Sequence, residues 1–281
     1  MDSYCVFGHP IEHSKSPWIQ TRFAELTGQT LKYEKTWVPL DAFSAKVHAF
    51  RAAGGKGCNV TLPFKTEAAA LAIECSPRVA LAQACNTLQF DGERIYGENT
   101  DGLGLVNDLV NNAGFSLQAC RILLIGAGGA SAGVLGPLLT HKPHCIWVAN
   151  RSVDKAIQLV ARHASLALAE DVDCQAFGLT HEAILSQSFD LVINASSSSL
   201  QQAALPVPAS VLQANGLACD LMYGPAAQGF MQWARAHGTE ARDGLGMLVE
   251  QAAASFQLWR GVQPPTQEVL AELRALVSPS T

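Results

Sequence analysis

Charged side chains are scarce in this 281-residue chain, where aspartate, glutamate, lysine and arginine together make up 15% of the residues. The formal net charge is −5 and the sequence pI is near 5.9. A basic patch of the kind that binds nucleic acid or anionic lipid is not apparent, which excludes those partners. Hydrophobic residues make up 48% of the chain, which excludes a disordered protein and indicates a sizeable core.

Metal-ligand and disulfide patterns are also missing. The eight cysteines never form C-x-x-C, several lie inside apolar runs, and the eight histidines show no metal-ligand spacing. We therefore expect reduced structural thiols, no metal site and a cytoplasmic protein. Asp2 stands where a signal peptide carries its basic residues, and glycines and Pro137 interrupt the uncharged span 122–140, so we expect neither export nor a membrane helix.

A glycine-rich turn follows a short apolar run near the middle of the chain. Residues 122–125 are Ile-Leu-Leu-Ile, which suits a parallel strand buried on both faces. Gly126, Gly128 and Gly129 then provide no Cβ where the chain must reverse, so backbone N–H groups and a helix N-terminus can face a pyrophosphate. Ser131 replaces the third glycine of the usual fingerprint. The stretch predicts a dinucleotide site.

The end of the next predicted strand indicates which dinucleotide binds. Asn150, followed by Arg151 and Ser152, stands 24 positions after Gly126 (150 − 126). An NAD site usually has an acidic residue there to hold the ribose hydroxyls. The planar guanidinium of Arg151 instead matches a 2′-phosphate, and Lys155 adds a second positive charge. The pattern predicts NADP rather than NAD, although Arg151 and Lys155 by themselves are also compatible with solvated surface charges.

The predicted elements indicate an α/β fold with two domains. Residues 105–111 form a helix, after which helices alternate with strands at 122–125, 145–149, 174–177, 191–194 and 216–221. This alternation predicts a doubly wound parallel sheet of the Rossmann type. The N-terminal part has strands at 3–7, 31–39 and 58–62, helices at 16–28, 41–53 and 67–73, and a hairpin across Asp91-Gly92. We expect Ser16 to cap the first helix, and two further helices, at 248–259 and 270–276, to end the chain.

Three polar clusters in the N-terminal half follow strand ends or loops, where a sheet can aim side chains into a site. Ser14 and Ser16, beside a helix N-terminus, suit a small carboxylate, although a simple helix cap also explains Ser16. Strand alternation points Asn59 and Thr61 to one face, and Lys65 follows them. The third cluster is Asn86-Thr87 with residues 99–102.

Lys65 and Asp101 are the candidate catalytic pair, although a solvated surface lysine is the alternative for Lys65 alone. If Asp101 approaches Lys65, an attraction of about 4 kcal/mol at ~4 Å and an effective dielectric of ~20 outweighs moderate desolvation of the ammonium. Lys65 then stays protonated and can donate a proton to a carbonyl that is being reduced.

Taken together, these motifs resemble the shikimate dehydrogenase family. The resemblance runs in the same order along nearly the whole chain, and it is carried by residues 14–16, 59–65, 86–87, 99–102, 126–130, 150–152 and 243–251. It implies an NADP-dependent, reversible reduction of 3-dehydroshikimate to shikimate in the chorismate pathway to aromatic amino acids. It further implies a substrate domain of residues 1–101 plus 246–281 and an NADP domain of residues 102–245. We expect a monomer or homodimer whose only other partner is the small-molecule substrate.

The resemblance also assigns roles to individual positions. Lys65 and Asp101 would be catalytic, and Ser14 and Ser16 would hold the substrate carboxylate. Ring hydroxyls would bind to Asn59, Thr61, Asn86, Asp101 and Gln251. NADP would bind to Gly126, Ala127, Gly128, Gly129, Ala130, Asn150, Arg151, Ser152 and Lys155, with Met222, Tyr223 and Gly244 near the nicotinamide.

Two departures from the family pattern and two alternative functions remain at this point. Ser199 stands where the family usually has glycine, and Glu98 replaces the more usual aspartate before Asn99. One alternative is a broader dehydrogenase that also accepts quinate, with NAD or NADP. The other is an NADP(H)-binding sensor without catalysis, although a sensor has no need for a proton donor such as Lys65.

Overall fold

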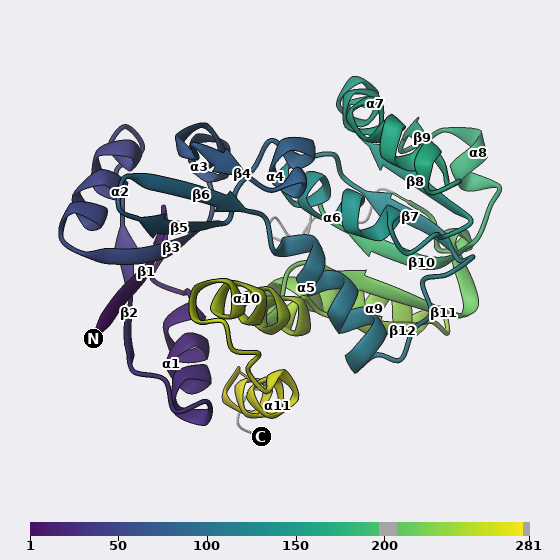
Figure 1. The fold of residues 1–281 in the computed structure, drawn as a ribbon. Helices are drawn as coiled ribbons and strands as arrows, with labels where there is room; N and C mark the ends of the chain where they lie inside the picture. The colour runs from purple at the N-terminus through teal and green to yellow at the C-terminus, as the bar shows by residue number, and fades with distance from the viewer. Residues whose placement is uncertain (197–206, 278–281) are drawn as a thin grey trace. The chain divides into compact units, whose positions relative to one another are not determined.

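The computed structural model describes residues 1–196 and 207–277, so Ser199 lies outside the described residues. The chain divides into two compact units (Figure 1). The first combines Met1–Gly104 with Leu248–Leu276, and the second is built on Leu105–Met247. Both units are α/β, and they form the expected two-domain fold with an N-terminal α/β part and a Rossmann-type part. The substrate and cofactor roles expected for residues 1–101 with 246–281 and for 102–245 remain predictions.

A six-stranded mixed sheet with the order β2-β1-β3-β5-β6-β4 forms the first unit. Its strands are β1 (Asp2–Gly8), β2 (Leu31–Trp37), β3 (Gly55–Val60), β4 (Glu74–Cys75), β5 (Thr87–Asp91) and β6 (Arg94–Glu98). Strand β1 runs parallel to β2 and β3, and β3, β5 and β6 pair antiparallel. The predicted hairpin is confirmed, with Gly92 at a φ of +59° in its turn.

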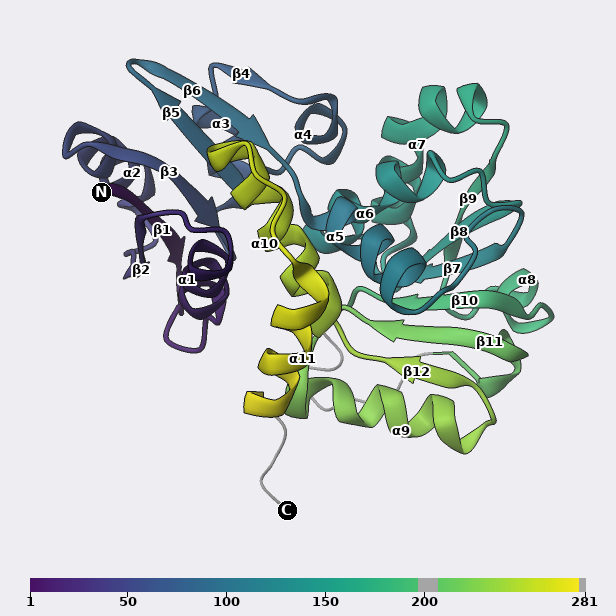
Figure 2. The ribbon, with the colours of Figure 1, turned by 60° about the horizontal axis from the view of Figure 1, so that its bottom comes forward.

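Helices from both ends of the chain complete this unit. They are α1 (Ser16–Leu26), α2 (Phe43–Ala52), α3 (Lys65–Leu71), α4 (Pro77–Ala82), α10 (Leu245–Arg260) and α11 (Thr266–Val277). The Trp259 indole of α10 donates to the Leu88 carbonyl at 3.1 Å, and Gly57 leaves room for it, because a Cβ there would lie 2.5 Å from the indole nitrogen. Figures 1 and 2 show α11 near α1, where Arg22 binds Glu272 at 2.8 Å.

The sheet of the second unit contains six parallel strands in the order β12-β11-β10-β7-β8-β9. They are β7 (Arg121–Ile125), β8 (Cys145–Asn150), β9 (Asp173–Gly178), β10 (Phe189–Asn194), β11 (Leu212–Asp220) and β12 (Glu240–Arg242). The chain builds outward from β7 to β9, then returns to β10 on the other side of β7. The predicted doubly wound parallel sheet is confirmed, with its change of direction between β7 and β10.

The helical elements of this part are α5 (Asp101–Asn107), a π-helical turn (Asp108–Asn112), α6 (Gly129–Leu139), α7 (Val153–Ala169), α8 (Glu182–Leu185), two 3₁₀ turns (Ala209–Val211 and Gly224–Ala227) and α9 (Gln228–Ala236). Helix α6 packs on α7, and α9 lies along β11 and β12 (Figure 2). The uncharged span 122–140 is strand, turn and helix, as expected. Among residues 1–196 and 207–277 there is no helix with the length and hydropathy that crossing a bilayer requires.

Several predicted boundaries were wrong. Ser16 is the first residue of α1 rather than its cap, because Lys15 occupies the cap position and the Ser14 hydroxyl accepts from the Ser16 N–H at 3.3 Å. Helix α3 begins at Lys65, two residues early, and α5 begins at Asp101, four residues early. The elements β4, α4 and β12 were not predicted, because they are short and lack a clear hydrophobic period.

Candidate functional site

Lys65 and Asp101 form a direct ion pair in the first unit, with 2.5 Å between Nζ and Oδ2. Lys65 opens α3, directly after Phe64, which is fully buried and stacks on Phe43 at a centroid distance of 4.9 Å. This packing fixes the first turn of the helix and leaves the lysine stem at its surface. The two side chains are 20% and 8% exposed, so water screens the pair only partly. The expected approach of Asp101 to Lys65 is therefore present.

Asp101 is held from its backbone and from its side chain. It begins α5, and its N–H donates to Asn99 Oδ1 at 3.1 Å. Asn86 Nδ2 donates to Asp101 Oδ1 at 2.8 Å, which leaves Oδ2 for the ammonium of Lys65. One carboxylate oxygen thus faces a neutral donor and the other a charged one, so the side chain has little rotational freedom.

A buried network joins Asn86 to Gln251 and Thr100. Asn86 Nδ2 also lies 3.2 Å from Gln251 Oε1 and 2.9 Å from Thr100 Oγ1, so its two protons are shared among these two acceptors and Asp101 Oδ1. Asn86 Oδ1 accepts from the Thr100 N–H at 2.9 Å. Gln251 lies on α10 and is 9% exposed, whereas Asn86 is 3% exposed. The structure therefore brings together Lys65, Asp101, Asn86 and Gln251 from four separate stretches of the chain.

Asn59 lies on β3 behind this network, and neighbouring groups already bind its amide. Its Oδ1 accepts from the Tyr33 hydroxyl at 2.7 Å, and its Nδ2 lies within reach of Thr87 Oγ1 and Ser255 Oγ, both at 3.0 Å. Burial raises the pKa of Tyr33 well above its ordinary value, so the phenol keeps the proton that it donates. Binding of a ring hydroxyl by Asn59 would require exchange of one of these contacts.

Ser14, Ser16 and Thr61 lie at the loops that follow β1 and β3. Ser14 is half-buried before α1, and Ser16 is 8% exposed at its first residue. Thr61 follows β3 directly, and its N–H donates to the Phe7 carbonyl at 2.9 Å. A Cβ on Gly8 would lie 2.5 Å from the Thr61 methyl group, so glycine is needed where these two loops meet. Within the described residues, no hydrogen bond joins the serines to the Lys65–Asp101 pair.

The glycine-rich turn of the second unit has the geometry of a phosphate cradle. Gly126 follows β7 directly with a φ of +112°, and its N–H donates to the Ala149 carbonyl at 2.8 Å. Gly128 caps α6 without a side-chain bond to the first turn, and added Cβ atoms on Gly128 or Gly129 would meet nothing within 4 Å. Between Ala127 and Ala130, no side chain therefore crowds the start of α6, where the first N–H groups of a helix have no partner within the helix.

The residues expected to read the 2′-phosphate follow β8, which lies beside β7 in parallel register. Asn150 ends the strand, and its Nδ2 donates to the Ser152 carbonyl at 2.9 Å, which closes the loop around Arg151. Arg151, Ser152 and Lys155 are all exposed, and Lys155 lies in the first turn of α7. Arg151 makes no ion pair with any residue in the described ranges.

Met222, Tyr223 and Gly244 lie near the ends of β11 and β12. Fully buried Asp220 accepts from the Met222 N–H at 2.8 Å, and the Gly244 N–H donates to the Met222 carbonyl at 2.8 Å. A Cβ on Gly244 would lie 2.3 Å from the Leu221 carbonyl oxygen, so only glycine fits there. Burial raises the pKa of Tyr223. Four parallel strands, β7, β8, β11 and β12, thus carry the expected cofactor residues at or just after their carboxyl ends.

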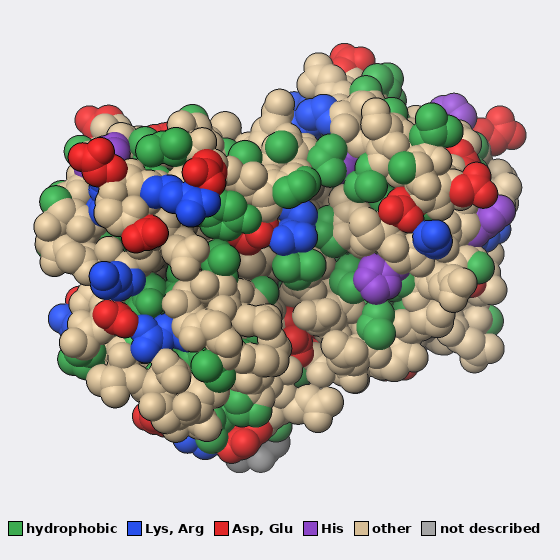
Figure 3. All heavy atoms as spheres, in the orientation of Figure 1, with side chains coloured by type: hydrophobic (Ala, Val, Ile, Leu, Met, Phe, Trp, Pro, Cys, Tyr) green, Lys and Arg blue, Asp and Glu red, His purple; other side chains and the backbone are tan. Residues whose placement is uncertain are grey.

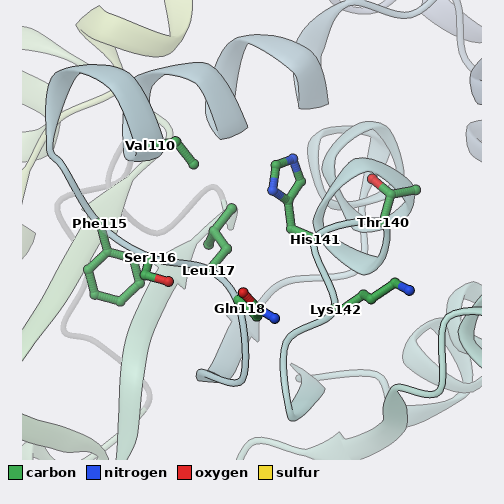
Figure 4. Close-up of a pocket in the computed structure, with 8 residues that line it drawn as sticks. All are labelled: Val110, Phe115, Ser116, Leu117, Gln118, Thr140, His141 and Lys142. Carbon is green, nitrogen blue, oxygen red and sulfur yellow. The ribbon is translucent and has the colours of Figure 1, made fainter.

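A separate cavity of about 320 Å³ opens elsewhere on the second unit (Figure 4). Its lining residues are Val110, Phe115, Ser116, Leu117, Gln118, Thr140, His141 and Lys142. They include the segment that precedes β7, at the end of the strand opposite to Gly126, and none of the expected site residues. On the face drawn in Figure 3, acidic and basic side chains are interspersed.

Tyr33, Ser255, Ser76, Arg78 and Glu98 were missing from the expected site, although they support it. Ser255 stands four residues after Gln251 on α10, so the i, i+4 spacing could have identified it. Ser76 and Arg78 precede Asn86 in a segment without a periodic pattern. Glu98 was predicted to differ from the family pattern, but not to bind other side chains.

Three family models match the chain. The model described as "Shikimate dehydrogenase substrate binding domain" matches residues 6–88. That of "Shikimate / quinate 5-dehydrogenase" matches residues 108–203, and that of "Shikimate 5'-dehydrogenase C-terminal domain" matches residues 244–274.

Individual relatives match along nearly the full length. Shikimate dehydrogenase (NADP(+)) of Acidovorax sp. (strain JS42) is 56% identical over 277 residues, which are 99% of this chain and 97% of that protein. The crystal structure of an Ael1 enzyme from Pseudomonas putida superposes with a TM-score of 0.90 at 44% identity, covering 97% and 98% of the two chains. Shikimate 5-dehydrogenase from Thermus thermophilus, in complex with NADP(H) and shikimate, gives a TM-score of 0.84 at 31% identity, covering 98% and 99%.

Proposed function

The chain belongs to the shikimate dehydrogenase family, and on this premise we propose that Lys65 and Asp101 are the catalytic pair of its reaction. The protein is an NADP-dependent oxidoreductase that interconverts 3-dehydroshikimate and shikimate, a step in the biosynthesis of aromatic amino acids through chorismate. The observation that carries our assignment of the pair is the 2.5 Å contact between Lys65 Nζ and Asp101 Oδ2, within a network of buried neutral amides.

The residues at the carboxyl ends of β7, β8, β11 and β12 fit NADP. The open space over Gly128 and Gly129 and the uncapped N-terminus of α6 suit a pyrophosphate. Arg151, exposed and without an ion pair among the described residues, suits the 2′-phosphate, with Lys155 as a second cation. Asn150, Ser152, Met222, Tyr223 and Gly244 complete the proposed set. When bound, NADPH supplies the hydride for the reduction.

Lys65 supplies the proton in this proposal. The ammonium donates it to the oxygen of the carbonyl that is being reduced, which becomes the hydroxyl of the product. The carboxylate of Asp101 holds the ammonium in place, because opposite charges at hydrogen-bond distance attract strongly in a partly buried site. In the reverse direction, neutral Lys65 accepts the proton from the substrate hydroxyl.

The remaining polar residues of the first unit bind the substrate. Ser14 and Ser16 offer two hydroxyls beside the N-terminus of α1 for the carboxylate, where the helix dipole favours an anion. Thr61, Asn86 and Gln251 bind ring hydroxyls together with Asp101, and Asn59 either joins them or holds Asn86 from behind.

The test is formation of NADPH by the purified protein with shikimate or quinate as the substrate and NADP or NAD as the oxidant. We expect rapid turnover with shikimate and NADP, because no carboxylate occupies the position at which an NAD site binds the ribose. Comparable turnover with quinate or NAD would contradict this specificity. Binding of NADPH without turnover in all four mixtures would contradict the assignment of Lys65 and Asp101.

We further propose a cytoplasmic protein that is a monomer or homodimer. The eight cysteines are free thiols, and six of them are buried, which supports a reducing compartment. Light scattering coupled to gel filtration measures the mass of the assembly directly.

A further inference from the structure

Glu98 is a buried carboxylate at the end of β6, three residues before Asp101, and it is 6% exposed. Its Oε1 accepts from Ser76 Oγ at 2.5 Å, from Arg78 Nε at 3.0 Å and from the Asn99 N–H at 2.8 Å. Its Oε2 accepts from Arg78 Nη2 at 2.8 Å. The guanidinium therefore binds both carboxylate oxygens, an arrangement that fixes the orientation of the two groups as well as their distance.

The contacts of Glu98 lead to the backbone of Asp101 through Asn99. Glu98 Oε1 accepts a hydrogen bond from the Asn99 N–H, and Asn99 Nδ2 donates to the Ala84 carbonyl at 2.9 Å. Asn99 Oδ1 in turn accepts the Asp101 N–H at 3.1 Å. Only two residues separate the end of β6 from the start of α5, so the position of Glu98 determines where α5 begins.

A second set of contacts leads from Glu98 to the backbone of Lys65 and the side chain of Asp101. Ser76 caps α4 by accepting the Val79 N–H at 3.3 Å, and its own hydroxyl binds Glu98. The segment after α4 provides two contacts to the pair. The Cys85 N–H donates to the Lys65 carbonyl at 2.8 Å, and Asn86 Nδ2 donates to Asp101 Oδ1 at 2.8 Å.

We propose that Arg78 and Glu98 are positioning residues for Lys65 and Asp101. The proposal rests on the function assigned above to that pair. Neither residue contacts Lys65 Nζ or Asp101 Oδ2, so both act through Asn99 and through the segment from Ser76 to Asn86. Without Arg78, Glu98 keeps only the neutral donors Ser76 and Asn99 and the distant Tyr96 hydroxyl at 3.5 Å, and a buried carboxylate so poorly compensated moves toward water.

The test is a double-mutant cycle of Arg78→Ala and Lys65→Ala, with kcat and KM measured for both substrates. Because small misplacements of reacting groups are costly, Arg78→Ala should lower kcat by about 10- to 100-fold and leave the KM for NADP within about twofold. In the Lys65→Ala background, Arg78→Ala should lower kcat by less than about twofold, because the ammonium that Arg78 positions is already absent. Arg78→Lys retains the charge but cannot bind both oxygens, so it should recover part of the loss.

The matched control is Arg94→Ala, which removes the pair of Arg94 with Glu74 in the same sheet, where both side chains are 53% exposed. We expect this variant to keep the wild-type kcat. Equal kcat in Arg78→Ala and Arg94→Ala would overturn the inference. An equal fold decrease of kcat on Arg78→Ala in the wild-type and in the Lys65→Ala backgrounds would also overturn it. If Arg78→Ala does not fold, Arg78→Lys with wild-type kcat would overturn it instead. Full activity of Lys65→Ala would overturn the proposed function as well, whereas an inactive Lys65→Ala beside an active Arg78→Ala overturns the positioning role alone.

Discussion

Replacement of Lys65 by alanine tests the catalytic pair most directly. The ammonium is 2.5 Å from Asp101 Oδ2, and no other lysine or arginine among the described residues pairs with Asp101. Loss of a general acid typically lowers kcat by about 10² to 10⁴-fold, which corresponds to about 2.7 to 5.4 kcal/mol of transition-state free energy. The KM values should change much less, because the carboxylate-binding serines and the cofactor residues remain.

The same substitution has a bounded effect on stability. Asp101 loses its charged partner but keeps Asn86 as a donor at 2.8 Å, and the Lys65 side chain is already 20% exposed. The loss of one charge-assisted hydrogen bond is worth about 1.5 to 3 kcal/mol, so the free energy of unfolding should fall by no more than this amount. Steady-state formation of NADPH and thermal melts of Lys65→Ala measure the two effects separately.

Lys32→Ala is the control for this experiment, because Lys32 pairs with Glu34 on the surface of the same unit and its side chain is 53% exposed. We expect this variant to retain wild-type kcat and melting temperature. The reasoning would be refuted by a Lys65→Ala protein that melts like the wild type and keeps its kcat.

Three further predictions concern other parts of the molecule. Arg151→Ala should weaken NADP(H) binding by about 1.5 to 3 kcal/mol and leave NAD(H) binding nearly unchanged; equal losses in calorimetric titrations would mean that Arg151 does not contact the 2′-phosphate. Burial lowers the pKa of His163, so the unfolded chain takes up a proton near pH 6.5 that the folded protein does not. The free energy of unfolding should therefore fall below about pH 6.5 by at most about 1.4 kcal/mol per pH unit, and urea titrations of His163→Gln should show a weaker pH dependence. Burial raises the pKa of Cys85, Cys120 and Cys174 to about 12, so these thiols react slowly. A thiol reagent should therefore label exposed Cys75 first. Fast labelling of a Cys75→Ser protein would contradict this order of reactivity.

The strands and helices with a clear hydrophobic pattern could be predicted from sequence, because their buried positions hold apolar residues in runs or at regular spacing. Residues 122–125 of strand β7 are an uninterrupted apolar run, and all four are buried. The glycines after it marked the start of α6. Strands β4 and β12, with two and three residues, are too short to show an apolar pattern. Their positions depend on pairing with β6 and β11.

The candidate site was predictable where polar residues cluster at strand ends, as with Asn59 and Thr61 or Asn86 and Thr87. The predicted N-cap of α1, Ser16, was wrong; it rested on the preference of helix N-caps for serine. Lys15 occupies the cap position instead, and the Ser14 hydroxyl accepts from the Ser16 N–H. Partners distant in sequence could not be foreseen. The pairing of Arg78 with Glu98 spans 20 residues, and the contact of Asn59 with Ser255 spans 196.

The return of α10 and α11 to the first sheet has a consequence for the order of folding during synthesis. Gln20 binds the Ala252 carbonyl across 232 positions, and Arg260 binds Asp2 across 258. The parallel sheet of the second unit, from β7 to β12, is instead built from one continuous stretch of chain. Because domains fold as units while the chain emerges, this later-made sheet can be completed while the sheet of the first unit still waits for its covering helices. Residues 248–276 are thus the last part that the first unit requires. A chain released without them lacks the indole of Trp259 that binds Leu88 of the sheet and the ring of Phe256 that packs on Phe23 of α1.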